Sequence, residues 1–165
     1  MLIHYWPTDF TVVTGRFGTN PDYYRQFNLP GHDGIDFRTA SSGYASPVYS
    51  CTTGAISFIG YRSPRDPYGY QVRVRLRFED RDYEIVYAHL VENSCRYVIG
   101  QQVQPGQVLG TGGETGNARG AHLHFSLMRA GASSRRETSF PFDLIDPEPY
   151  FRQYISTAGI EVDWQ

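Results

Sequence analysis

The sequence predicts an all-β fold, in which a mainly antiparallel sheet forms an open groove with short connecting turns and at most a short C-terminal helix. Residues 71–78 (QVRVRLRF) alternate between apolar and basic side chains, which is the pattern of a half-buried strand. Seventeen Gly and 10 Pro interrupt the apolar runs, as tight turns between short strands do. Aromatic residues make up 15% of the chain, a proportion typical of sheets that line a groove or a thin core.

The N-terminal third is expected to hold short strands and one aromatic loop. Residues 1–20 read as a lead-in with a short strand near 11–14. Residues 21–31 form the aromatic loop, and we expect Tyr23 and Tyr24 to line a substrate groove. For most of the other residues of this segment we favour a surface loop fixed to the core by its rings.

The middle of the chain predicts a hairpin. Residues 48–60 favour two strands around a glycine, or one strand bent there. The polar cluster at 79–82 joins strand 71–78 to a returning strand at 83–90. In the first of these strands, alternate residues face the core, and the arginines Arg73, Arg75 and Arg77 form a basic stripe. We favour a solvated face for this stripe over a surface that contacts an acidic polymer.

The C-terminal third predicts short strands within 98–110 and a further strand at 121–127. Alternation along this second strand places His122 and His124 on one face and Leu123 and Phe125 on the other. A polar loop is expected at 133–138. A short helix is expected from about 147 to 155, with proline at its start.

Bulk properties limit the classes of function. The net charge is −2, so nucleic acid is not an expected partner, and no apolar run approaches the roughly 20 residues of a membrane span. The first residues lack the basic start and apolar core of a signal peptide, which fits either export without a classical signal or a domain of a longer chain. Cys51 and Cys95 fit one disulfide or two free thiols.

Two pairs of polar residues indicate a metal site. His32 and Asp36 are four positions apart, so an extended chain places both on one face, where they form a zinc half-site. His122 and His124 form a second pair of this kind. Each pair has an ordinary explanation as well: a His–Asp hydrogen bond that orders a loop, or a chance His-x-His in a strand.

The positions of all five histidines strengthen the metal hypothesis. His4 lies in the lead-in, and the other four, including His89, lie at glycine-bounded turns or strand ends. Two histidines and one carboxylate suit a mononuclear zinc site with a fourth position for water. Two histidines then remain as acid/base groups. Spacing alone does not choose between His122 and His124 as a ligand.

The ordered motifs resemble those of the lysostaphin-type zinc metalloendopeptidases, which cut peptide bonds in bacterial peptidoglycan. The motifs are His32-Asp33-Gly34-Ile35-Asp36, Tyr87-Ala88-His89-Leu90, Thr115-Gly116-Asn117 and His122-Leu123-His124-Phe125. The glycine-punctuated segment 100–110 is also similar to the segment that this family has between its motifs. The resemblance covers about residues 17–127, and Asp146-Pro147 resembles the usual exit from the domain.

The resemblance implies a role for each site residue. One Zn²⁺ per chain would be held by His32, Asp36 and His124. His89 and His122 would be the unliganded catalytic pair, with His122 as the base. Asn117 joins Tyr23 and Tyr24 as an expected substrate-binding residue. Family members often place a tyrosine about six residues before the first ligand, where this chain has Gln26.

The predicted function is therefore zinc-dependent hydrolysis of peptide cross-links or stem peptides of bacterial peptidoglycan, in an extracellular, cell-wall or periplasmic setting. A domain of a larger wall hydrolase and a phage-type lysin both fit this prediction. Residues 1–165 are expected to form one monomeric domain, with a core at about 15–130 and a C-terminal extension at 131–165. The main alternative is an inactive relative that binds peptidoglycan or activates another hydrolase. A carboxypeptidase or amidase with similar ligands, and a purely structural zinc site, are further alternatives.

Overall fold

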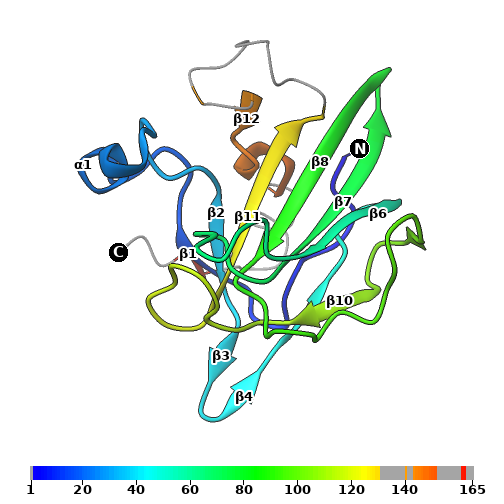
Figure 1. Ribbon diagram of the computed structural model, residues 1–165, viewed down its shortest axis with the longest axis horizontal. Helices are drawn as coiled ribbons and strands as arrows, with labels where there is room; N and C mark the ends of the chain where they lie inside the picture. The colour runs from blue at the N-terminus through cyan, green and yellow to red at the C-terminus, as the bar shows by residue number, and fades with distance from the viewer. Residues whose placement is uncertain (1, 131–139, 141–142, 152–160, 163–165) are drawn as a thin grey trace.

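A single twisted sheet dominates the computed structural model, which describes residues 2–130, 140, 143–151 and 161–162. Within these residues the sheet has nine strands, and its pairs are antiparallel except for β1 with β13 (Figure 1). In spatial order the strands are β13 (Glu161–Val162), β1 (Val12–Gly15), β2 (Ile35–Arg38), β11 (His122–Arg129), β8 (Arg81–Ala88), β7 (Gln71–Phe78), β6 (Gly54–Gly60) and β9 (Gln102–Val103), and β12 (Leu144–Ile145) also pairs with β11. The all-β prediction is confirmed.

Smaller elements surround this sheet. Strands β5 (Pro47–Tyr49) and β10 (Val108–Thr111) form one two-stranded sheet, and β3 (Ala40–Ser41) and β4 (Tyr44–Ala45) form another. The predicted aromatic loop instead contains a helical turn, α1 (Pro21–Tyr24), followed by a 3₁₀ turn, η1 (Arg25–Phe27). Proline at the first helical position favours this start, because its fixed φ suits a helix. None of the helices in the described ranges has the length and apolar character to cross a membrane.

The two faces of the sheet differ sharply. One face carries fully buried apolar side chains, including Phe37, Tyr87 and Phe125. The N-terminal segment covers it through Trp6, whose ring lies 5.0 Å from that of Phe37. The C-terminal helical residues 148–151 cover it through Phe151, which lies 5.2 Å from Phe125. The predicted helix is thus present to residue 151, and its remainder, like the expected loop at 133–138, lies outside the described residues.

The predicted hairpin is confirmed. Strands β7 and β8 pair from Val72↔Tyr87 to Phe78↔Arg81. The two residues between them, Glu79 and Asp80, both have positive φ (47° and 62°), as a tight two-residue hairpin turn requires. Elsewhere, Gly54 begins β6 and separates it from β5, so the two-strand interpretation of residues 48–60 holds. Cys51 and Cys95 are both free thiols.

The expectation of a fully solvated arginine stripe on β7 is wrong for Arg73. This residue is 5% exposed, and its Nη1 donates to Glu84 Oε1 on β8 at 3.0 Å. Its Nε donates to Gln71 Oε1 at 2.7 Å. The long side chain therefore lies down on the sheet and meets a buried carboxylate. Arg75 and Arg77 remain exposed.

We predict that Glu84→Ala lowers the free energy of unfolding by about 3 kcal/mol, because it leaves the buried Arg73 cation without its partner. Asp82→Ala on the same strand is the matched control. It breaks an exposed pair with Arg77 (3.3 Å) and should cost less than about 1 kcal/mol. Chemical denaturation of both variants measures the difference, and equal losses would contradict the assigned role of the buried pair.

Candidate active site

A groove of about 930 Å³ lies on the polar face of the sheet. Its floor includes His124 of β11 and Asp36 of β2. Its walls are α1 and the turn that follows it, the loop at 61–70 and the loop at 115–121. The open groove expected from the sequence is therefore present, and the predicted site residues line it.

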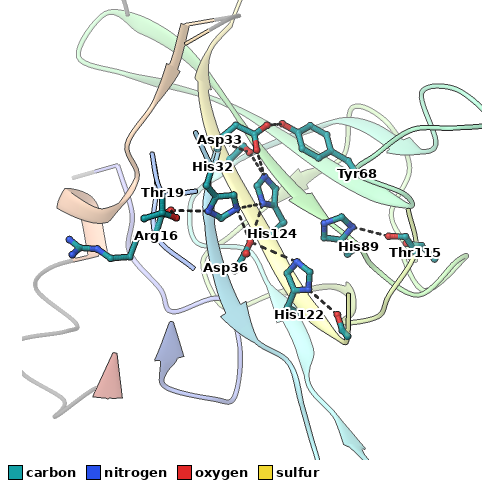
Figure 2. A network of polar contacts seen from close by, with 12 residues as sticks. Arg16, Thr19, His32, Asp33, Asp36, Tyr68, His89, Thr115, His122 and His124 are labelled. Atoms are coloured by element: carbon teal, nitrogen blue, oxygen red, sulfur yellow. Dashed lines mark hydrogen bonds and ion pairs between the residues drawn. The ribbon is translucent and has the colours of Figure 1, made fainter. Parts of the chain in front are cut away.

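Three predicted ligands meet on the floor of the groove. His32 Nε2 lies 3.0 Å from His124 Nδ1 and 3.2 Å from Asp36 Oδ1, and His124 Nδ1 lies 3.0 Å from the same carboxylate oxygen. Asp36 and His124 are directly paired across β2 and β11, which is why residues 88 positions apart come together. His32 enters from the bend just before β2. Figure 2 shows the resulting triangle of donor atoms.

Hydrogen bonds fix the tautomer of His124. Ser126 Oγ donates to the backbone carbonyl of Asp33 (3.0 Å), which can only accept. The hydroxyl oxygen therefore accepts from His124 Nε2 at 2.8 Å, so the ring proton lies on Nε2. Nδ1 then carries a lone pair that points into the triangle. Gly34 allows this packing, because a Cβ there would lie 2.9 Å from His124 Nε2.

A hydrogen bond also fixes the tautomer of His32, with the proton on the other ring nitrogen. Its Nδ1 lies 2.9 Å from the backbone carbonyl of Arg16, so Nδ1 carries the proton and Nε2 carries the lone pair. A further contact supports His124 from behind: the Tyr68 hydroxyl donates to the Asp33 carboxylate, which lies 3.4 Å from His124 Nε2. Such outer contacts are typical of metal-binding histidines, whose second nitrogen is held by a carbonyl or carboxylate.

The triangle fits a zinc ion by its chemistry. His32, Asp36 and His124 offer donor atoms that all lie within 4.8 Å of one another. Two imidazole lone pairs and a carboxylate oxygen repel each other at about 3 Å unless a cation lies between them. Two ligand atoms of a tetrahedral zinc with bonds near 2.0 Å lie about 3.3 Å apart, which is close to the separations here.

The charge of Asp36 agrees with this interpretation. Burial alone would raise the pKa of Asp36, but its close contacts with His124 and His32 outweigh burial and hold the pKa well below its usual value. The residue therefore remains a carboxylate. The pKa of His124 is raised. Burial lowers it, but the charges of Asp33 and Asp36 outweigh burial.

Two further histidines face the triangle without joining it. His89 Nδ1 lies 2.8 Å from the carbonyl of Thr115, and His122 Nδ1 lies 2.9 Å from that of Gly120. Each Nδ1 therefore carries the proton, and each Nε2 carries a free lone pair. The two rings are 4.7 Å apart, and His122 Nε2 lies 3.8 Å from Asp36 Oδ1 (Figure 2).

Backbone geometry aims His89 into the groove. The residue directly follows β8 and lies in the left-handed region (φ 61°), an uncommon conformation for a residue other than glycine. Its N–H donates to the Tyr68 carbonyl at 2.9 Å, and its own carbonyl accepts from Gly113 at 3.0 Å. Burial, together with the neighbouring His124 and His122, lowers the pKa of His89 to about 3. The ring is therefore neutral at physiological pH.

The predicted substrate-binding residues lie on the groove walls. Tyr23 and Tyr24 project from α1, and Arg119 lies 5.5 Å over the Tyr23 ring from the facing loop. The Tyr24 ring lies 5.3 Å from that of His32. Burial and the charges of Asp36 and Asp33 raise its pKa, so the Tyr24 hydroxyl keeps its proton beside the triangle. Asn117 is an exposed residue of the same lining.

Two loops that form one wall touch each other through their backbones. Gly69 and Gly116 both have positive φ (65° and 75°). A Cβ on either glycine would collide with the backbone of the other loop. Asn117 N–H also donates to the Pro67 carbonyl at 2.8 Å. The loops at 61–70 and 115–121 therefore form one packed unit.

Comparison with known proteins identifies the family. Residues 30–136, which include the ligand triangle and the two further histidines, match Peptidase family M23. The chain belongs to this family. The resemblance to lysostaphin-type peptidases noted in the sequence is thereby confirmed, and M23 peptidases include peptidoglycan endopeptidases.

Curated relatives are longer than this M23 chain. An uncharacterized metalloprotease of Haemophilus influenzae is 30% identical over 70% of the chain and 22% of its own length. The peptidoglycan DD-endopeptidase ShyC of Vibrio cholerae is 26% identical over 80% of the chain and 28% of its length. Lysostaphin of Staphylococcus simulans is 29% identical over 67% of the chain and 21% of its length. The chain thus spans between a fifth and a third of these relatives.

Solved structures share the M23 fold. The catalytic domain of lysostaphin from Staphylococcus simulans superposes with a TM-score of 0.57 at 26% identity, and the alignment covers 74% of this chain and 80% of that domain. LytU superposes with a TM-score of 0.62 at 25% identity over 86% of this chain and 84% of the other. A zinc-containing peptidase from Vibrio cholerae gives 0.55 at 27% identity over 78% and 37%.

We predict that Ser126→Ala weakens zinc affinity by about tenfold or more, because it removes the acceptor that fixes the His124 tautomer. Ser57→Ala is the control, since it removes a hydroxyl that donates to Glu84, outside the triangle. Competition with a chromogenic chelator measures both affinities. Equal affinities for the two variants would show that the Ser126 contact does not hold the ligand.

Proposed function

We propose that this M23 domain is an active zinc-dependent endopeptidase that hydrolyses peptide cross-links or stem peptides of bacterial peptidoglycan, at the cell wall or in the periplasm. In this proposal His32, Asp36 and His124 hold one Zn²⁺. The observation that carries it is the pair of imidazoles, His89 and His122, whose free Nε2 atoms face the ligand triangle. A structural zinc site has four protein ligands and needs no such pair.

His122 is the better placed general base. When bound, zinc would supply a Lewis acid that makes a nucleophile from water at neutral pH and polarises the scissile carbonyl. His122 Nε2 accepts the proton of the attacking water, and the resulting imidazolium lies 3.8 Å from the Asp36 carboxylate, which stabilises its charge. The ring then delivers this proton to the leaving amine as the C–N bond breaks.

We assign His89 a different role from that of His122. A donor to the oxyanion needs a proton on Nε2, but the His89 proton lies on Nδ1, and burial opposes a second proton. We assign it as an acceptor that positions the attacking water. The Tyr24 hydroxyl is a suitable donor to the oxyanion, because it is protonated and its ring lies 5.3 Å from that of His32. In this proposal Tyr24 takes the role of the family's tyrosine, although the expected position holds Gln26.

Two variants test the assigned ligand and base. We expect His32→Ala to lose both zinc and muralytic activity, since it removes a ligand. His122→Ala should keep about one zinc per chain and lose activity by a factor of about 100 or more, because it removes only the base. Metal analysis and clearing of purified cell walls give the two readouts. Wild-type protein that binds zinc but releases no fragment from any wall type would instead be a peptidoglycan-binding module.

The tyrosine pair supplies a matched test of the oxyanion donor. Tyr24→Phe should lower kcat by about 100-fold with unchanged zinc content, because one oxyanion donor is typically worth this much. Tyr23→Phe changes the neighbouring ring of the same helix and should stay within a few-fold of wild type. Steady-state kinetics on a synthetic wall peptide would refute the assignment if both variants behaved alike.

A further inference from the structure

A second hollow of about 270 Å³ adjoins the groove on the same face of the sheet. It is lined by Ser57, Phe58, Arg62, Arg73, Arg75 and Glu84. Arg62 and Arg73 line both spaces, so the groove continues into the hollow. We call these six residues the arginine hollow.

The arginine hollow contains more positive than negative charge. The Arg73 guanidinium donates hydrogen bonds to Glu84 and Gln71, and the Glu84 carboxylate balances its charge. Arg75, whose side chain is 57% exposed, approaches the same carboxylate only at 3.5 Å. Among the described residues, the Arg62 guanidinium forms no hydrogen bond or ion pair. One carboxylate therefore faces three cations.

Acidic residues elsewhere in the groove are already engaged. Asp36 belongs to the ligand triangle, and Asp33 accepts from Tyr68. Asp66 is buried and accepts from three N–H groups: the backbones of Arg62 (2.9 Å) and Tyr68 (3.0 Å) and the side chain of Gln71 (2.7 Å). Of the three guanidinium groups in the arginine hollow, those of Arg62 and Arg75 are thus available to a ligand.

The sheet register sets the distance from this hollow to the reaction centre. Val86 of β8 is paired with Arg73 on one side and with Ser126 on the other, and Ser126 contacts His124. Directly paired residues project from the same face, and neighbouring strands lie about 4.8 Å apart. The near edge of the hollow, at Arg73, is therefore about 10 Å from the strand that carries His124, a distance that an extended peptide spans in about three residues.

We propose that the arginine hollow binds a carboxylate of the substrate, located two or three residues from the scissile bond. This inference rests on the proposed function and names its substrate class. Guanidinium groups bind carboxylates through charge-assisted hydrogen bonds. A stem peptide with free carboxylates supplies such a group, whereas an oligoglycine bridge has no charged side chain. The enzyme accordingly selects acidic stem peptides over oligoglycine.

The test compares three synthetic substrates with zinc-loaded protein: a cross-linked stem peptide with free carboxylates, the same peptide with those carboxylates amidated, and an oligoglycine-bridged peptide. We expect kcat/KM to be at least about tenfold higher for the acidic peptide. The double variant Arg62→Gln/Arg75→Gln should lose this preference through a rise in KM. It should cleave the amidated peptide as wild type does.

Arg77→Gln is the matched control, because Arg77 is an exposed arginine of the same strand and face but lies outside the hollow. It should retain the full preference. Equal cleavage of acidic and amidated peptides by wild type, a preference for oligoglycine, or equal behaviour of the double variant and Arg77→Gln would each overturn the proposal.

Binding separates this proposal from the proposed function. Dissociation constants for the acidic and amidated peptides are measured on zinc-free protein, in which no cleavage occurs. If wild type cleaves no wall peptide, the proposed function fails. The carboxylate site is then supported if the acidic peptide binds about tenfold more tightly and the double variant abolishes the difference. It is overturned if the two peptides bind equally.

Discussion

The pairing of β2 with β11 is the constraint on which the rest of the site depends. It places Asp36 opposite His124 and keeps Phe125 and Phe37 in the core below them. A shift of one residue would turn His124 into the core and Phe125 into the groove, so the buried apolar face itself protects the ligand geometry. His32 adds the third donor from the bend before β2, without help from a regular strand.

Much of this arrangement could be predicted from the sequence, because it follows from local periodicity. Alternation along residues 121–127 placed His122 and His124 on one face, and the hairpin before His89 was visible in its turn residues. The partners that fix the tautomers were not predicted. Ser126 reads as an ordinary strand residue, and Asp33 and Tyr68 meet only because loops distant in sequence fold together. Periodicity carries no information on such contacts.

The expectation for Arg73 failed for a different reason. Alternation correctly placed it on the polar face, but a polar face was taken to mean a solvated one. The two-residue turn after Phe78 sets the register of β7 and β8, and this register brings Glu84 within reach of both Arg73 and Arg75. The sequence therefore contained the information for this ion pair, because Glu84 and Arg75 lie at equal distances from a recognisable turn. The helical turn of α1 was hidden by its aromatic residues, which favour strands and loops.

The backbone contact between Gly69 and Gly116 bears on how this groove can be re-engineered. Loops around such grooves are natural units for grafting between related proteins, since the sheet beneath them stays constant. Here neither loop is an independent unit. The backbones meet so closely at Gly69 and Gly116 that neither position has room for a side chain. A chimera that imports residues 61–70 from a relative must import 115–121 from the same donor, so that this wall of the groove is inherited as a matched pair.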